Sequence, residues 1–196
     1  ADGSYSFSGL TAGTYFVQEV LPAGYTETAP PGNVYTVTLA PGDNKGSFDF
    51  DNFQNISISG TKFNDLNGNG ARDSGDSGIQ GWTIALYTDT AGVLTATGKT
   101  TATDANGNYS FTNLPPLAVG TTYAVREVQQ SGWTQTTTNP PDITIASGEN
   151  ATGYNFGNFK LGCISGTKYV DVKGDDTMTT VGKADDTPYA GGVVVN

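Results

Sequence analysis

The chain has 196 residues, a formal net charge of −10, no histidine and one cysteine. This length accommodates one or two domains of ordinary size. The acidic balance, with no run of basic residues, argues against nucleic acid as a partner. No apolar run reaches membrane-spanning length, so we expect no membrane insertion in this segment. Histidine, the commonest general base, is absent and no catalytic motif is present, so we do not expect an enzyme.

An internal repeat organises the chain. Several segments recur: 1–10 at 105–114, 14–20 at 122–128, 50–53 at 156–159, and 59–63 at 165–169. The repeat distance is 106 residues from Asn52 to Asn158 and again from Lys62 to Lys168. A repeat this long indicates tandem domains. We therefore predict the C-terminal part of one module at 1–54, a complete module at 55–160, and the N-terminal part of a third at 161–196.

The strands predicted for the complete module follow one another in chain order. Residues 56–63 alternate between apolar and polar with period 2, and so do residues 81–87. Further short strands are expected at 109–111, 122–128, 142–145 and 154–156. No segment shows a sustained helical period, and only 14% of residues are charged. Many short strands separated by turn signals predict an all-β extracellular protein built as a β-sandwich.

The segment that follows the first of these strands has the ligand spacing of a calcium loop. Gly70 occupies loop position 6, and side-chain or backbone oxygens occupy positions 1, 3, 5, 7, 9 and 12, supplied by Asp65, Asn67, Asn69, the Ala71 carbonyl, Asp73 and Asp76. A hard dication needs six to eight oxygen ligands, and this spacing predicts Ca²⁺ as the bound ion. The alternative is a plain Asn-Gly turn between strands. Three unliganded carboxylates in twelve residues would repel one another, which favours calcium.

Two weaker ion sites are also candidates. Asp104 and Asn106 precede a strand and either contribute to a second ion site or only shape the turn. The third module opens with a degraded copy of the calcium loop, in which Asp171, Asp175 and Asp186 correspond to Asp65, Asn69 and Asp76. Lys173 replaces one ligand there, and a lysine does not coordinate calcium.

Three polar residues lie on the apolar faces of their strands. Strand alternation places Lys62 with Ile56 and Ile58, and it likewise places Glu127 and Asn158 on apolar faces. Burying a charge is costly unless it is paired, so we expect these three residues to meet. The simplest arrangement is a buried Lys62–Glu127 ion pair hydrogen-bonded to Asn158.

The combined motifs resemble the B-type repeats of bacterial surface proteins, the Cna-B and SdrD B-like domains. The resemblance rests on Ser59-Gly-Thr-Lys62-Phe-Asn-Asp65, the calcium loop, Val125-Arg-Glu127-Val and Asn155-Phe-Gly-Asn158-Phe. It implies tandem immunoglobulin-like (Cna-B/prealbumin-like) sandwiches. It also implies a covalent alternative to the ion pair, an isopeptide bond between Lys62 and Asn158 promoted by Glu127.

The partial modules repeat this pattern. Glu19 and Asn52 occupy the matching places in the first, and Lys168 occupies the matching place in the third. One hypothesis is that Lys168 of one chain completes a module with Glu19 and Asn52 of the next, which would build a head-to-tail fibre.

The resemblance and the calcium loop together predict a calcium-stabilised structural repeat of an extracellular stalk, adhesin or filament at the cell surface. Its expected partners are neighbouring modules or subunits of the same protein. The alternative is an adhesin module that binds carbohydrate or protein through its sandwich loops.

Overall fold

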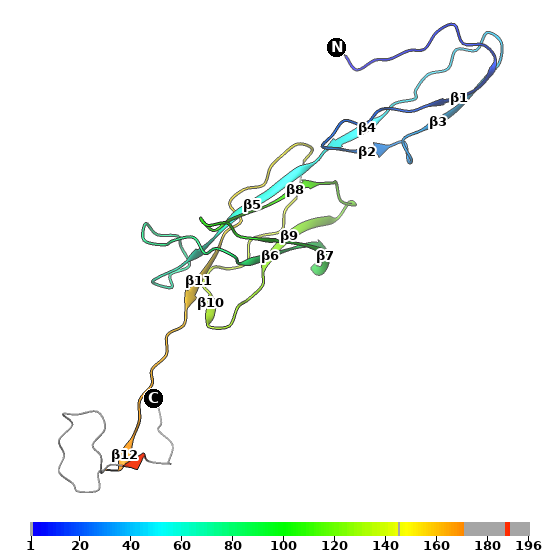
Figure 1. Cartoon of the computed structure of the whole chain (residues 1–196). Helices are drawn as coiled ribbons and strands as arrows, with labels where there is room; N and C mark the ends of the chain where they lie inside the picture. The colour runs from blue at the N-terminus through cyan, green and yellow to red at the C-terminus, as the bar shows by residue number, and fades with distance from the viewer. Residues whose placement is uncertain (1, 145, 171–186, 189–196) are drawn as a thin grey trace. The chain divides into compact units, whose positions relative to one another are not determined.

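All regular structure in the described part of the chain is β-strand. The computed structural model describes residues 2–144, 146–170 and 187–188 (Figure 1). The chain divides into two compact units, residues 1–160 and residues 161–196. Among the described residues there is no helix of the length and apolarity needed to cross a membrane.

The complete module consists of two sheets. The first has the strand order β10-β11-β5-β8, made of β10 (Trp133–Gln135), β11 (Phe156–Lys160), β5 (Ile56–Asn64) and β8 (Asn108–Leu114). The second has the order β7-β6-β9, made of β7 (Val93–Ala102), β6 (Thr83–Thr90) and β9 (Thr121–Glu127). Strands β5 and β11 pair in parallel, with Lys62 opposite Phe156. The other pairs in these sheets are antiparallel.

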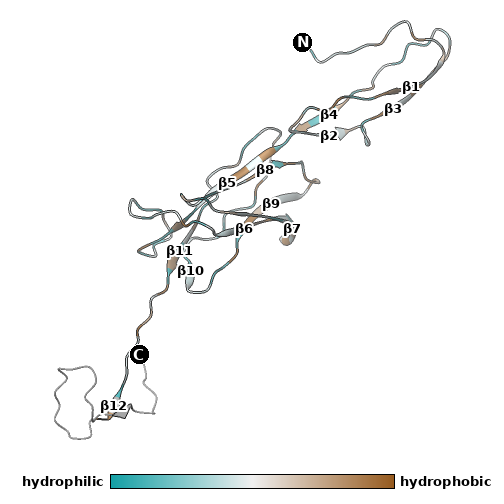
Figure 2. Ribbon diagram, in the orientation of Figure 1, coloured by the Kyte–Doolittle hydropathy of each residue, from teal (hydrophilic) through white to brown (hydrophobic). Residues whose placement is uncertain are grey.

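The core lies between the two sheets and follows from strand alternation. Strands β5, β6, β8 and β9 contribute alternate apolar side chains to one cluster, such as Ile58, Leu86, Phe111 and Val125, and β11 adds Phe156. Figure 2 shows the corresponding hydrophobic segments of β5 and β11 in brown. Burying a side chain of this size contributes about 1.5–3 kcal/mol. These contacts confirm the predicted all-β sandwich.

The first 54 residues form two strand pairs. Strand β1 (Gly13–Val17) pairs with β3 (Tyr35–Leu39), and β2 (Tyr25–Ala29) pairs with β4 (Asp51–Gln54), both antiparallel. In the second unit, β12 (Tyr169–Val170) pairs with β13 (Thr187–Pro188).

Most of the predicted strands are present. Strands β5, β6, β8 and β9 coincide with the predicted strands to within a few residues. The prediction for 142–145 is wrong for its described residues, because Ile143 forms only an isolated bridge with Tyr123. Strand β11 begins at Phe156, where the last predicted strand was expected to end. Strand β7 was not predicted, because its residues are almost all exposed and show no apolar alternation. The three-residue strand β10 was not predicted either.

Gly60 allows the segment before β11 to cross closely over β5. A Cβ atom at this position would lie 1.9 Å from the carbonyl oxygen of Tyr154 and 2.9 Å from the Tyr109 ring. Real Cβ atoms do not tolerate these distances, so a side chain would push the two segments apart.

Gly60→Ala is therefore expected to destabilise the chain by about 1–3 kcal/mol or more. Urea denaturation measures the effect. Gly46→Ala is the matched control, because no atom lies within 4 Å of a Cβ built there. Equal midpoints for the two variants would contradict the close crossing.

Candidate functional site

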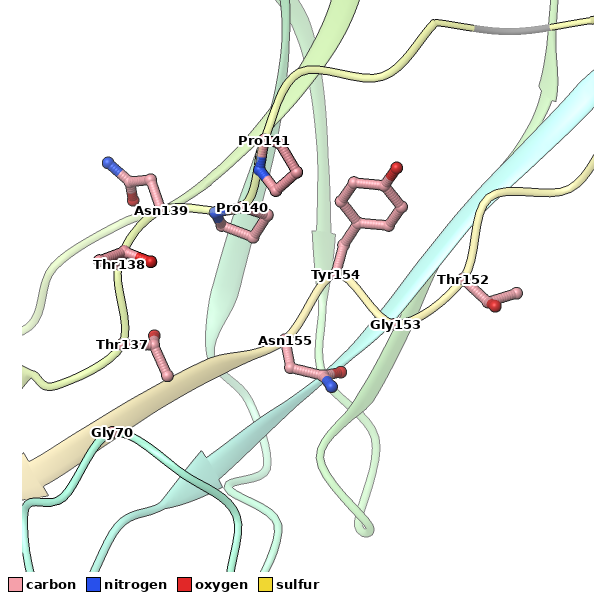
Figure 3. Close-up of a pocket in the computed structure, with 10 residues that line it drawn as sticks. All are labelled: Gly70, Thr137, Thr138, Asn139, Pro140, Pro141, Thr152, Gly153, Tyr154 and Asn155. Carbon is pink, nitrogen blue, oxygen red and sulfur yellow. The ribbon is translucent and has the colours of Figure 1, made fainter.

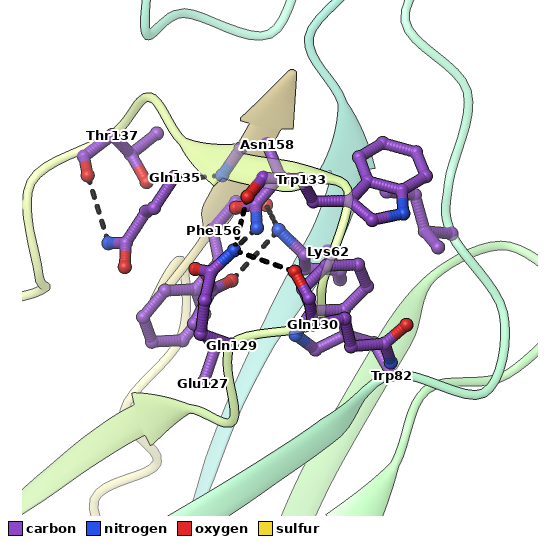
Figure 4. A network of polar contacts seen from close by, with 12 residues as sticks. Lys62, Trp82, Glu127, Gln129, Gln130, Trp133, Gln135, Thr137, Phe156 and Asn158 are labelled. Carbon is purple, nitrogen blue, oxygen red and sulfur yellow. Dashed lines mark hydrogen bonds and ion pairs between the residues drawn. The ribbon is translucent and has the colours of Figure 1, made fainter. Parts of the chain in front are cut away.

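A buried ion pair joins the two sheets of the complete module. Lys62 extends from β5, and its Nζ lies 2.9 Å from Oε2 of Glu127, the last residue of β9 in the opposite sheet. Both side chains are almost completely shielded from solvent. The other carboxylate oxygen of Glu127 accepts a hydrogen bond from Asn158 Nδ2 on β11 at 2.8 Å (Figure 4). The predicted meeting of these three residues is confirmed.

Aromatic and backbone groups complete the surroundings of the ammonium. Lys62 Nζ lies 4.3 Å from the ring centroid of Trp82, within the range of a cation–π contact. It also donates to the Phe156 carbonyl at 3.5 Å. Trp133 packs edge-on against Trp82, with 5.6 Å between ring centroids. Sequence reasoning did not assign Trp82 to this group, because no spacing rule relates it to Lys62.

The buried environment changes the acidity of Lys62. Burial lowers the pKa of its ammonium to about 8, although the hydrogen bond and the charge of Glu127 act to raise it. A larger fraction of Lys62 is therefore a neutral amine at physiological pH than for an exposed lysine. A neutral amine is nucleophilic, whereas an ammonium is not. Asn158 Oδ1 is buried without a hydrogen-bond partner among the described residues.

The predicted calcium loop begins three residues after Lys62 and is closed at its base. Asn64 N–H donates to the Ser77 carbonyl at 2.8 Å, and Ile79 N–H donates to the Lys62 carbonyl at 2.9 Å. Asp65 N–H donates to the Asn158 carbonyl at 2.9 Å. The loop is thereby attached to β11, the strand that carries Asn158.

Asp65 is the buried centre of this loop. Its carboxylate accepts hydrogen bonds from the N–H groups of Gly68, Asn69 and Gly70 at 2.8–3.2 Å. Burial acts to raise the pKa of Asp65, but the Thr136 hydroxyl and these N–H groups outweigh burial and hold the pKa below its ordinary value. The carboxylate is thus kept ionised, as a calcium ligand must be. No pattern in the sequence relates Thr136 to Asp65, because Thr136 lies in a distant loop after β10.

The other predicted ligands are linked to one another around Asp73. Its Oδ2 accepts hydrogen bonds from the side-chain amides of Asn67 at 2.8 Å and Asn69 at 2.9 Å. Asp73 N–H donates to Asp76 Oδ2 at 2.8 Å. Within the described residues, no three acidic, cysteine or histidine side chains form a ready metal-binding group. The oxygen chemistry and the gathering of these side chains in one loop nevertheless suit Ca²⁺, so the calcium site stays a prediction.

Of the weaker candidates for ion ligands, Asp104 and Asn106 lie in the turn before β8. Asp104 Oδ1 accepts from the N–H groups of Asn106 and Asn108, both at 2.8 Å, which is the geometry of a turn-stabilising aspartate. These bonds describe its structural role, and its role as an ion ligand stays a prediction. Asp171, Asp175 and Asp186 lie outside the described residues.

An open cavity of about 440 Å³ lies beside the calcium loop (Figure 3). Its lining combines polar side chains with two prolines and one aromatic ring: Gly70, Thr137, Thr138, Asn139, Pro140, Pro141, Thr152, Gly153, Tyr154 and Asn155. Asn155 is already committed to the fold, because its Oδ1 accepts from Thr61 N–H at 2.8 Å.

Comparison with known proteins places these features in a family. The model of the SdrD B-like domain matches residues 56–171. The chain belongs to the SdrD B-like domain family. It is 34% identical over 146 residues to serine-aspartate repeat-containing protein D of Staphylococcus aureus (strain Newman), covering 69% of this chain. It is 29% identical over 163 residues to serine-aspartate repeat-containing protein F of Staphylococcus epidermidis, covering 76% of this chain. The match spans 10% of the length of each of these relatives.

Solved structures of surface and pilus proteins are also similar to this chain. A single B repeat unit of the collagen-binding surface protein Cna of S. aureus matches with a TM-score of 0.34 and 16% identity, covering 77% of this chain and all of the repeat. A shaft pilin SpaA of Lactobacillus rhamnosus GG, the E269A/D295N double mutant, matches with a TM-score of 0.40 and 13% identity, covering 78% of this chain and 66% of the pilin.

Removing one partner of the buried pair should lower the free energy of unfolding more than replacing both partners with apolar residues. Glu127→Leu leaves the Lys62 ammonium buried and unpaired, which is expected to cost about 3–5 kcal/mol of unfolding free energy. The double variant Lys62→Met/Glu127→Leu replaces the pair with apolar groups and should recover most of that loss. Urea denaturation of the three chains tests this order. A single variant as stable as the unmodified chain would contradict the buried pair.

Proposed function

We propose that this chain is a stretch of an extracellular stalk or filament at the cell surface, built from calcium-stabilised β-sandwich repeats. Its family membership supports a structural repeat rather than an enzyme. The Cna repeat and SpaA come from a surface protein and a pilus shaft, respectively. Its partners in this role are the neighbouring modules or subunits of the same protein.

The observation that carries the proposal is the joint between successive modules. Strand β4 continues into β5 through Asn55 alone, and hydrogen bonds hold both sides of that residue. Asn55 N–H donates to the Gly24 carbonyl at 2.8 Å, while Gly148 N–H donates to the Gln54 carbonyl at 2.9 Å. The Asn55 side chain accepts from Thr26 and donates to Asn113. A joint held on both sides suits an extended stalk better than a flexible linker does.

Calcium would support this function by fixing the loop that follows β5, at the end of its pairing with β11. Asp65, Asn67, Asn69, Asp73 and Asp76, with the Ala71 carbonyl, would hold the ion. The ion would neutralise the carboxylates and hold the loop at this end of the sandwich.

Calcium should therefore raise the melting temperature of the chain. An ion that binds only the folded state adds about 2.7 kcal/mol at a free concentration 100-fold above its Kd. For a chain of this size that corresponds to roughly 5–10 °C. Thermal unfolding in calcium and in excess chelator measures the shift.

Two variants give this experiment its controls. Asp73→Asn removes an exposed loop carboxylate and should reduce the shift, whereas Asp49→Asn removes an exposed carboxylate outside the loop and should not. An identical melting temperature in calcium and chelator would remove calcium from the proposed function.

The arrangement of Lys62, Glu127 and Asn158 supports a second stabilising interaction, an amide crosslink between Lys62 and Asn158. In this reaction the neutral Lys62 amine attacks Asn158 Cγ, and Glu127 accepts and returns the proton. One C–N bond forms to Lys62 Nζ, one breaks, and the Asn158 amide nitrogen leaves as ammonia. The bridging position of Glu127 and the lowered pKa of Lys62 both favour this reaction.

The intact mass of the denatured chain tests the crosslink. The expected mass is that of the sequence less one ammonia, because the bond survives denaturation. Glu127→Gln and Lys62→Met should each restore the full mass, and Lys99→Met, an exposed lysine on β7, should still show the loss. If the unmodified chain has the full mass of its sequence, no crosslink forms and Lys62 and Glu127 interact only as an ion pair.

The polar cavity beside Gly70 supports a second candidate function, binding of carbohydrate or protein by an adhesin module. Tyr154 offers an aromatic ring and Asn139 an amide at its rim (Figure 3). Binding of the purified chain to a glycan array or to cells, lost in Tyr154→Ala, would favour this function over a purely structural one.

A further inference from the structure

The predicted calcium loop contains two of the three Asn-Gly pairs in the chain. They are Asn67-Gly68 and Asn69-Gly70, and the third is Asn106-Gly107 in the turn before β8. Asparagine loses its side-chain amide most readily before glycine, because glycine has no side chain to hinder the approach of its backbone nitrogen. Asn67 and Asn69 are both exposed to water, which the second step of this reaction consumes.

Deamidation of an asparagine proceeds through a five-membered imide ring. The backbone nitrogen of the following residue attacks the side-chain Cγ and forms a new N–C bond. The bond from Cγ to Nδ2 breaks, and the amide leaves as ammonia with the proton of the backbone nitrogen. Water then opens the ring at either carbonyl. One product is aspartate, and the other is isoaspartate, in which the main chain runs through Cγ.

In the calcium loop one carboxylate holds both attacking nitrogens. Gly68 N–H donates to Asp65 Oδ1 and Gly70 N–H donates to Asp65 Oδ2, both at 2.8 Å. Asp65 is fully buried, so water does not compete for these charge-assisted bonds. Each glycine nitrogen keeps its proton and is directed toward the carboxylate, and it must break this bond before it can attack. Asp65 thus withholds both nucleophiles.

The two asparagine side chains are held as well. The Nδ2 groups of Asn67 and Asn69 donate to Asp73 Oδ2 at 2.8 and 2.9 Å. Asn67 Oδ1 accepts from Asn69 N–H at 3.1 Å, and Asn69 Oδ1 accepts from Ala71 N–H at 2.8 Å. Each side-chain amide is therefore bonded through both its nitrogen and its oxygen. Its Cγ cannot turn toward the glycine nitrogen without breaking one of these bonds.

The third Asn-Gly pair is held in a different way. Gly107 is buried, and its N–H donates to the backbone carbonyl of Asp104 at 2.9 Å. A Cβ built on Gly107 would lie 2.1 Å from the Lys62 carbonyl oxygen. Backbone packing fixes this glycine, and no carboxylate binds its N–H. Asn106 is therefore a reference site in the same chain, with the same dipeptide and no bond to Asp65.

We propose that Asn67 and Asn69 are deamidation sites that the Asp65 carboxylate keeps unreactive while the loop is closed. Opening of the loop releases both glycine nitrogens together, and closing it again does not reverse the conversion. Aspartate at loop position 3 or 5 still offers an oxygen ligand, whereas isoaspartate adds a carbon to the main chain and disturbs the ligand spacing. Every bond involved joins protein groups, so the protection does not require calcium.

Peptide mapping by mass spectrometry tests the proposal, because deamidation replaces NH by O at a defined residue. The full chain is incubated at mildly alkaline pH, folded and, in parallel, unfolded in urea. Asn67 and Asn69 should deamidate roughly tenfold or more slowly in the folded chain, because reaction there requires local opening. Asp65→Ala should accelerate both sites by a similar factor and leave Asn106 at its folded rate.

Asp104→Ala is the matched control. It removes a carboxylate that accepts from the N–H groups of Asn106 and Asn108 but from no glycine, so Asn67 and Asn69 should stay slow. If Asp65→Ala accelerates Asn106 as well, the variant has unfolded and Asp65→Asn decides. Asp65→Asn keeps one acceptor oxygen, so it should accelerate at least one loop site while Asn106 stays at its folded rate.

Equal rates at Asn67 and Asn69 in the folded and the unfolded chain would overturn the protection. Unchanged rates at both sites in the Asp65 variants would overturn the role of the carboxylate.

Discussion

The fold depends on a lysine and a glutamate that lie on opposite sheets and are removed from water together. Lys62 enters the core from β5 and Glu127 from the end of β9, and neither has another charged partner among the described residues. Separating them inside the core would leave two desolvated charges, so the sheets are held at the spacing and register that keep 2.9 Å between Nζ and Oε2. The hydrophobic contacts around them supply most of the stability, while the pair limits which arrangement of the sheets is acceptable.

The ion pair and the calcium loop act on the same two strands. Asp65 follows Lys62 by three residues, and its N–H group donates to the carbonyl of Asn158. Strand β5 opens the complete module and β11 closes it, so a pull along the chain acts first on these strands. Their parallel pairing, the polar group between them and the loop at their ends all oppose separation.

The same pattern appears in the N-terminal segment in a different state. There Asn52 Nδ2 donates to Glu19 Oε2 at 2.7 Å, as Asn158 Nδ2 donates to Glu127 Oε1 at 2.8 Å in the complete module. The Tyr5 hydroxyl donates to the Phe48 carbonyl, as the Tyr109 hydroxyl donates to the Tyr154 carbonyl in the complete module.

The sequence by itself determined the repeat, the all-β class and the meeting of Lys62, Glu127 and Asn158. Strand alternation is a local property, and a charge on an apolar face has few acceptable partners. The sequence could not reveal β7, because an exposed strand shows no alternation of apolar residues. It also could not show that Ile143 forms only an isolated bridge where a strand was predicted. Only the tertiary structure brought Trp82 over the ammonium, Thr136 to Asp65 and Gly60 against the Tyr154 carbonyl. Those contacts join residues far apart in sequence, and their geometry depends on how two sheets pack, which no local pattern encodes.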